Sequence, residues 1–114
     1  MFDHCGRPDL AAGLRQPGFE ALLALGRAGR AVVKLSGFAK FSREGFPFVD
    51  ARPVIDAMAQ AFGLQQCVWA SDWPFLKAPY RLDYGPLLKI YEGMFTADER
   101  HQLMWLSAKT HFGF

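Results

Sequence analysis

The sequence predicts an α/β fold built around a parallel β-sheet. Short apolar segments typical of strands alternate with segments of helical periodicity, in the order strand, helix, strand, helix, strand, helix, helix. This alternation is typical of parallel strands joined by right-handed helical crossovers. A polar cluster follows each predicted strand, and such folds carry their chemistry at the carboxyl ends of the strands. With 114 residues the chain has the size of one small domain, covering residues 1–114.

The predicted strands are three short apolar segments. Ala31–Ser36 contains two valines and precedes Gly37, which is typical of a buried strand. Cys67–Ser71 is a second apolar run and precedes Asp72. Met1–His4 is the shortest candidate and leads into the polar sequence DHCGRPD. We expect these segments to form adjacent parallel strands.

Four helices are predicted from apolar spacing and from residues that favour helix ends. Apolar residues at helical spacing place one face of each helix toward the core. Asp50 is expected to cap one helix, and Thr96 and Glu99 have the spacing of a capping box. The predicted helices are Leu10–Gly29, Asp50–Phe62, Asp83–Met94 and Thr96–Lys109.

Composition excludes several classes of function. Thirteen basic and eleven acidic residues give a net charge of +2, too small for binding driven by non-specific attraction to nucleic acid. No apolar run reaches the ~18–20 residues of a membrane span, and the first residues lack the order of a secretory signal. Cys5 and Cys67 make no disulfide framework, and free thiols are typical of a reducing compartment. We therefore expect a cytoplasmic protein with neither a nucleic-acid nor a membrane partner.

The aromatic content is large for a domain of this size, with eleven Phe and three Trp. Because a small domain keeps much of its surface exposed, either these rings pack unusually well or some face a partner or a further part of the protein. A group of rings without helical spacing lies in the loop after Ala31–Ser36 and is expected to cover a pocket or an interface. These rings are Phe38, Phe41, Phe46 and Phe48.

The densest group of chemically active side chains is DHCGRPD, residues 3–9. A histidine at a strand end can act as a general base or a metal ligand, and Arg7 can hold a carboxylate through two parallel hydrogen bonds. A polar turn with a surface histidine explains His4 equally well. Cys5 fits a small buried residue better than a nucleophile, because no Cys–His–Asn pattern accompanies it.

Two further positions carry charge near the predicted strand ends. Asp72 in SDWP can take a proton from water or bind a divalent cation, although an aspartate there more often caps a loop or helix. Lys34 lies in an apolar strand and needs a partner, for which Asp3 and Asp72 are the candidates. Lys40 either contacts an anionic substrate or is a solvated loop charge.

Together these motifs resemble the amidohydrolase-related family of TIM-barrel, metal-dependent hydrolases. The resemblance rests on DHCGRPD, VKLSG with its FAKFS continuation, WASDWP and a helix pair ending in FGF, in that order across the whole chain. It implies a partial TIM barrel, namely the last three βα units with parallel strands, followed by C-terminal helices. A complete barrel has about 250 residues, so residues 1–114 are expected to form its C-terminal portion. The branch that the motifs resemble includes 2-pyrone-4,6-dicarboxylate lactonase.

The resemblance also implies roles for individual residues. Asp72 matches the general base that activates the hydrolytic water, and His4 matches a histidine that polarises the substrate or contacts a metal. Arg7 matches an arginine that binds a substrate carboxylate, and Lys40 stands where this branch has an arginine. Ser36, in the KLSG motif, completes the expected substrate-binding set. The implied reaction is hydrolysis of a lactone, ester or amide of a small anionic organic acid by base-activated water.

The resemblance leaves two alternatives for the cofactor: one divalent metal ion, zinc or manganese, or no cofactor at all. If a metal is bound, His4 and Asp72 are its expected ligands. The family's His-x-His pair of the first barrel strand does not occur in this sequence. Two alternatives to a hydrolase therefore stay open, a catalytically inactive fragment and a decarboxylase of the same superfamily. We expect the isolated chain to lack activity, and either to self-associate or to require a chain that supplies the N-terminal barrel strands.

Overall fold

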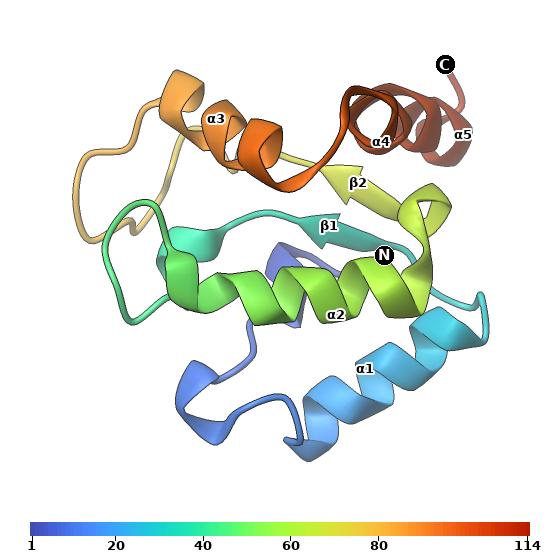
Figure 1. Cartoon of the computed structure of the whole chain (residues 1–114), viewed down its shortest axis with the longest axis horizontal. Helices are drawn as coiled ribbons and strands as arrows, with labels where there is room; N and C mark the ends of the chain where they lie inside the picture. Colours follow the sequence, from blue (N-terminus) through green and yellow to red (C-terminus); the bar gives the residue numbers. More distant parts are fainter.

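The computed structural model describes residues 1–114, in which helices pack against a small parallel sheet (Figure 1). The sheet contains β1 (Val33–Leu35) and β2 (Cys67–Trp69), and the helices are α1 (Pro17–Arg27), α2 (Arg52–Phe62), α3 (Tyr84–Met94), α4 (Ala97–His101) and α5 (Ser107–Phe112). In Figure 1, α1 and α2 are drawn below the strands and α3, α4 and α5 above them, and residues of α1, α2 and α3 share one core with Val33, Leu35 and Cys67. The predicted α/β class with parallel strands is confirmed.

Strand β1 is the centre of the parallel pairing. On one edge it pairs with β2, with Val33 opposite Cys67. On its other edge, Phe2 forms a single parallel bridge with Val33. The Phe2 N–H donates to the Val32 carbonyl, and the Lys34 N–H donates to the Phe2 carbonyl, both at 2.8 Å. The carboxyl ends of these segments therefore lie at one edge of the sheet, toward which both arrows point in Figure 1.

The predicted strand at Met1–His4 is reduced to a single parallel bridge at Phe2, on the expected side of β1. The chain enters a 3-10 turn at His4–Gly6, where His4 has a φ of 51°. This left-handed backbone cannot continue a strand ladder. The other two predicted strands are present but shorter than Ala31–Ser36 and Cys67–Ser71.

The predicted helix Leu10–Gly29 is divided into two pieces. A 3-10 turn at Leu10–Ala12 is capped by Asp9, whose carboxylate accepts a backbone N–H at 2.9 Å, and the chain leaves this turn at Gly13. Helix α1 then begins at Pro17, because the fixed φ and missing N–H of proline suit a first helical turn.

Asp50 does not cap α2 as predicted. Its carboxylate accepts hydrogen bonds from the Ser42 hydroxyl and, at 2.7 Å, from the Arg43 N–H, so it closes the loop that precedes the helix. Helix α2 begins at Arg52 with Pro53 in its first turn. The side chain of Asp50 therefore stabilises the loop and not the helix end.

The predicted capping box is confirmed at the start of α4. The Glu99 N–H donates to Thr96 Oγ1 at 3.2 Å, and the Thr96 N–H donates to Glu99 Oε2 at 2.8 Å. A π-helical turn, Gln102–Leu106, joins α4 to α5. Helix α5 ends at Phe112, three residues beyond the predicted end at Lys109.

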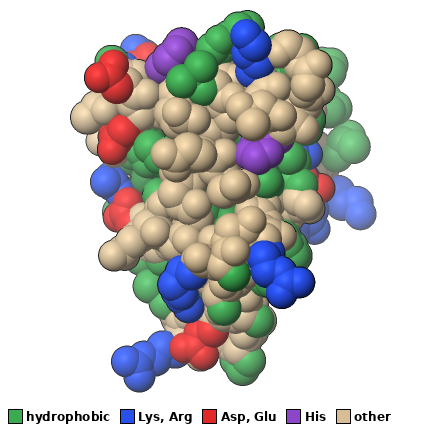
Figure 2. Space-filling model, turned by 90° about the vertical axis from the view of Figure 1, so that its right-hand side faces the viewer, with side chains coloured by type: hydrophobic (Ala, Val, Ile, Leu, Met, Phe, Trp, Pro, Cys, Tyr) green, Lys and Arg blue, Asp and Glu red, His purple; other side chains and the backbone are tan.

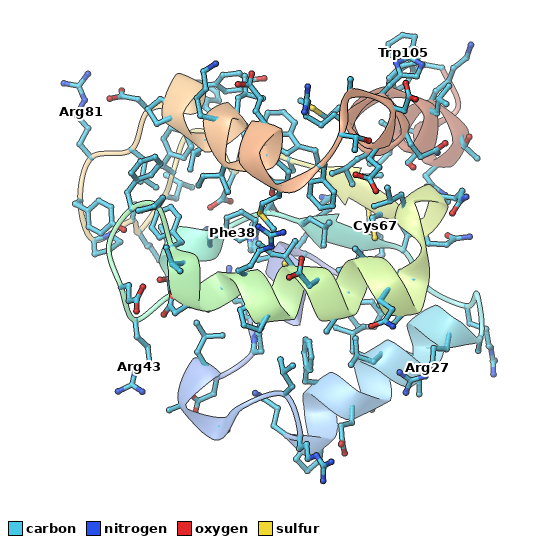
Figure 3. All side chains as sticks on the ribbon, viewed as in Figure 1. Arg27, Phe38, Arg43, Cys67, Arg81 and Trp105 are labelled. Carbon is cyan, nitrogen blue, oxygen red and sulfur yellow. The ribbon has the colours of Figure 1, made fainter.

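The core fills the space between the sheet and the helices. Leu35 of β1 and Met58 of α2 are fully buried within it. Phe38 points into the interior between α2 and α3 and stacks on Tyr91 with ring centroids 5.8 Å apart (Figure 3). Phe48 is also buried, whereas Phe46 is half exposed, so only part of the aromatic loop covers the surface.

The face turned away from the carboxyl edge of the sheet mixes both signs of charge. Figure 2 shows lysine and arginine side chains interspersed with acidic ones around this face. Trp105 points outward from the C-terminal helices (Figure 3), with its ring centroid 5.7 Å from that of Phe114. None of the helices has both the length and the apolar character that a membrane crossing requires.

Tyr91 connects α3 to the sheet, since its buried hydroxyl donates to the Leu35 carbonyl. We predict that Tyr91→Phe lowers the free energy of unfolding by about 1–3 kcal/mol, because the Leu35 carbonyl stays buried without its partner. Urea unfolding followed by circular dichroism measures this change. Tyr84→Phe, at the half-exposed first residue of the same helix, is the control and should change the value by less than about 0.5 kcal/mol. Equal effects of the two substitutions would contradict the prediction.

Candidate active site

The candidate site lies at the carboxyl edge of the sheet, where three segments of the chain end close together. His4 follows the bridge at Phe2, Ser36 follows β1, and Asp72 follows β2. Because all three segments run in parallel, the residues that follow them emerge at the same edge. Residues far apart in the sequence are thereby brought into contact.

His4, Asp72 and Lys40 form the centre of the site. His4 Nε2 lies 3.4 Å from Asp72 Oδ1, and Lys40 Nζ lies 3.1 Å from Asp72 Oδ2. The three side chains are only 14%, 17% and 16% exposed. The carboxylate is thus held between an imidazole and an ammonium group in a largely water-excluded position.

The backbone of the site is held in unusual conformations. His4 and Asp72 have φ values of 51° and 63°, and Cys5 and Arg7 have φ values of 54° and 49°. Residues other than glycine seldom adopt this left-handed region, and such strain concentrates at functional sites. The clustering of four such residues around the His4–Asp72 contact therefore supports a functional role for this edge.

Burial lowers the pKa of His4, and the positive charges of Lys40 and Arg7 lower it further. The charge of Asp72 acts in the opposite direction but does not outweigh burial. The His4 ring is therefore neutral at pH 7. A neutral imidazole carries one N–H, and can donate one hydrogen bond and accept another.

A hollow of about 340 Å³ adjoins the site and is lined by Arg7, Lys40 and Lys77, together with Ala39 and Pro79. No acidic side chain lines it. Arg7 and Lys77 form no ion pair with any carboxylate, so two unpaired cations face this hollow. The arrangement can bind an anionic group beside Asp72.

Lys77 is a residue that the sequence reasoning missed. It lies in the loop after β2, the same loop that begins with Asp72. A basic residue shortly after a strand-end aspartate was the available signal, but it does not distinguish a solvated loop charge from one that lines a hollow.

Two other predicted residues have clear positions. Lys34 pairs with Asp3 at 2.8 Å, one of the two partners considered, and this hydrogen bond lowers the pKa of Asp3. Ser36 is buried, and its Oγ lies 3.2 Å from His4 Nδ1. Ser36 therefore contacts the imidazole of His4 directly.

Cys5 is fully buried, and its thiol lies 3.8 Å from the Lys34 carbonyl. Burial raises the pKa of Cys5 to about 12, and that of Cys67 also to about 12. The reactive species of a cysteine is the thiolate, which is scarce at neutral pH with such a pKa. Cys5 therefore anchors the turn that carries His4 and is not a nucleophile.

Sequence comparison identifies the family to which this arrangement belongs. The amidohydrolase family matches residues 1–114, and the chain belongs to this family. This agrees with the family inferred from the order of the motifs.

Individual relatives include several hydrolases. A 4-sulfomuconolactone hydrolase from Rhizobium radiobacter is 34% identical over 74 residues, which are 65% of this chain and 24% of that protein. A solved protein from Pseudomonas putida, assigned as a 2-pyrone-4,6-dicarboxylic acid hydrolase, matches with a TM-score of 0.82 and 32% identity over 97% of this chain and 41% of its own. An amidohydrolase from Burkholderia multivorans, solved with bound zinc, matches with a TM-score of 0.72 and 28% identity over 98% of this chain and 43% of its own. The chain thus spans a minor part of the length of each of these relatives.

The residues of this chain do not fit a complete metal site. A zinc site uses three or four protein ligands, whereas His4 and Asp72 provide two. No three His, Cys, Asp or Glu side chains converge anywhere in residues 1–114. In addition, the Lys40 ammonium contacts the second carboxylate oxygen of Asp72, Oδ2, where it competes with a divalent cation.

The lowered pKa of His4 predicts how the stability depends on pH. As the pH falls through the ordinary histidine pKa of about 6.5, the unfolded chain takes up a proton that the folded chain does not, so the free energy of unfolding decreases. We predict that the wild-type protein loses more stability between pH 8 and pH 5 than His4→Asn, a residue that tolerates the left-handed backbone.

Urea unfolding of both proteins at several pH values measures the difference. All other side chains are the same in both proteins, so the difference between the two pH profiles reports His4. A larger pH-dependent loss in His4→Asn would contradict the prediction.

The buried thiols give a second prediction. We expect neither Cys5 nor Cys67 to react with a thiol reagent at neutral pH in the folded protein, and both to react when urea unfolds it, because burial keeps both pKa values near 12. With a thiol reagent that releases a coloured product, the absorbance of that product measures how many thiols have reacted. Rapid modification of one thiol under native conditions would show that the site around Cys5 opens.

Proposed function

We propose that these residues form the base and the anion-binding part of a site that hydrolyses a lactone of a small anionic organic acid. The observation that carries the proposal is the contact between His4, Asp72 and Lys40 beside a hollow lined by cations. Lactone hydrolases among the relatives support the choice of a lactone over other esters or amides.

Asp72 is proposed as the general base. An ionised carboxylate can take a proton from a water molecule as that water attacks a carbonyl carbon. The water oxygen forms the new bond to carbon, the ring C–O bond breaks, and the leaving oxygen receives the proton from Asp72. The contact with Lys40 holds the carboxylate in a fixed orientation for both transfers.

His4 is proposed to stabilise the developing negative charge on the carbonyl oxygen. Its ring is neutral because burial lowers its pKa, so it acts as an N–H donor rather than as a cation. A donor fixed in a position with little exposure stabilises such charge more strongly than water does. The distance of 3.4 Å to Asp72 leaves the N–H free to change partner when a substrate binds.

Arg7 and Lys40 are proposed to hold a carboxylate or sulfonate of the substrate. Arg7 has no acidic partner and lines the hollow together with Lys40. A guanidinium group matches the two oxygens of such an anion. Lys77 adds a third positive charge to the same hollow.

The chain by itself is proposed to bind the anion without turning it over. The relatives that it resembles are longer, and residues 1–114 correspond to 41% of the Pseudomonas putida protein. Further barrel strands, from the rest of the same protein or from a partner chain, would pair with the open edges of the sheet and close the site against water.

We predict that 2-pyrone-4,6-dicarboxylate perturbs the NMR signals of Arg7, Lys40 and Asp72 in the chain of residues 1–114, and that Arg7→Met weakens its binding by about tenfold, the loss expected for one charge-assisted contact. Arg27→Met, which removes an exposed arginine of α1, is the matched control. Equal binding by both variants would contradict the assignment of Arg7.

Turnover is tested by grafting residues 1–114 onto the Pseudomonas putida protein in place of its matching 41%. The grafted protein should open the lactone ring, as followed by ultraviolet absorbance, and Asp72→Asn should abolish the reaction but retain binding. Asp56→Asn, an exposed carboxylate paired with Arg52, should leave the reaction unchanged. Turnover by residues 1–114 alone that Asp72→Asn abolishes would show that the chain is a complete hydrolase.

A further inference from the structure

His4 occupies a backbone position that does not by itself fix its side chain. It begins a short 3-10 turn with a φ of 51°, after the single bridge at Phe2. No regular helix or strand holds it on either side. The orientation of its ring must therefore come from tertiary contacts, and the residue pair that follows β1 supplies two of them.

Gly37 lies directly against the imidazole. A Cβ atom on Gly37 would lie 2.5 Å from His4 Nδ1 and 2.6 Å from His4 Cγ, closer than the 3.0 Å that real Cβ contacts respect. The ring thus occupies space that only glycine leaves free. The same residue has a φ of 68°, which glycine adopts without strain.

Ser36 contacts the ring at one of its two nitrogens. Its Oγ lies 3.2 Å from Nδ1, while Asp72 Oδ1 lies 3.4 Å from Nε2. An ionised carboxylate can only accept hydrogen bonds, so the single N–H of a neutral imidazole lies on Nε2. Nδ1 is then unprotonated and accepts a hydrogen bond from the Ser36 hydroxyl.

We propose that Ser36 and Gly37 are positioning residues for the His4 imidazole. They hold the ring in place and keep its N–H on Nε2, directed at Asp72 and the reacting group. Gly37 sets the place of the ring, and Ser36 sets its tautomer. Ser36, expected from the sequence to bind substrate, acts through His4. The catalytic value of this ring position and tautomer rests on the proposed function, in which Nε2–H stabilises the carbonyl oxygen.

NMR of the chain with ¹⁵N-labelled histidine tests the proposal. At a pH about two units above the ordinary histidine pKa, the shifts of Nδ1 and Nε2 report which nitrogen carries the proton. We expect His4 to be in the Nε2–H form, and Ser36→Ala to reduce the ratio of the two tautomers by about fivefold, as expected for one hydrogen bond. Ser36→Thr, which retains the hydroxyl, should restore the wild-type ratio, and His101 and His111 should not change.

Two results would overturn the proposal: a wild-type His4 protonated on Nδ1, or an unchanged tautomer ratio in Ser36→Ala. The measurement needs no substrate and no turnover. The tautomer ratio can therefore be interpreted even if the proposed hydrolase reaction is not found. Failure of the positioning role and failure of the proposed function are thus distinguishable.

The steric part is tested with a matched pair of glycine substitutions. Gly37→Ala and Gly29→Ala place alanine at φ values of 68° and 66°, but a Cβ on Gly29 meets nothing within 4 Å. Both variants therefore carry the same backbone strain, and only Gly37→Ala displaces the ring. We expect the His4 signals to shift in Gly37→Ala alone, and equal His4 spectra in the two variants would contradict the role of Gly37. If Gly37→Ala does not fold, as judged by circular dichroism, the tautomer ratio in Ser36→Ala decides.

Discussion

Parallel pairing on both edges of β1 is the constraint on which the site depends. Phe2 bonds to one edge of this strand and β2 to the other, and all three segments run in the same direction. If either pairing were antiparallel, His4 and Asp72 would emerge at opposite ends of the sheet. The direction of the strands, set by the helical crossovers between them, thus brings an imidazole and a carboxylate into contact.

Charge around Asp72 is unbalanced in a way that suits an anionic ligand. One carboxylate faces Lys40, while Arg7 and Lys77 have no acidic partner. The chain as a whole has a net charge of only +2, so these cations make up a local excess and not part of a general basic surface. A small anion can therefore be attracted to this edge without the protein binding polyanions elsewhere.

The sequence predicted the class of fold because the alternation of apolar segments depends on nothing outside the chain. It also predicted that His4 and Asp72 would lie at one edge, since strand direction fixes the edge. It did not predict that Met1–His4 pairs only at Phe2, because the left-handed backbone of His4 is stabilised by contacts with residues distant in sequence.

Side-chain partners were harder to predict than elements. Asp50 had the sequence context of a helix cap, but Ser42 and Arg43 in the folded loop offered it better donors. Ser36 was placed in the site by its motif, yet only coordinates show that its hydroxyl contacts His4 Nδ1. Phe38 and Phe46 look alike in the sequence, and the loop conformation decides which of them is buried.

The left-handed conformations at the site also limit which residues evolution can place there. Histidine, aspartate and asparagine are among the few non-glycine residues that tolerate positive φ. At His4 and Asp72 the backbone and the chemistry therefore favour overlapping sets of residues, and a drift to asparagine would leave the fold intact while removing the base. At Arg7 the two demands diverge, because arginine gains nothing from this backbone. An arginine retained at that position among homologues would reflect ligand binding, since selection for folding alone would favour glycine or asparagine.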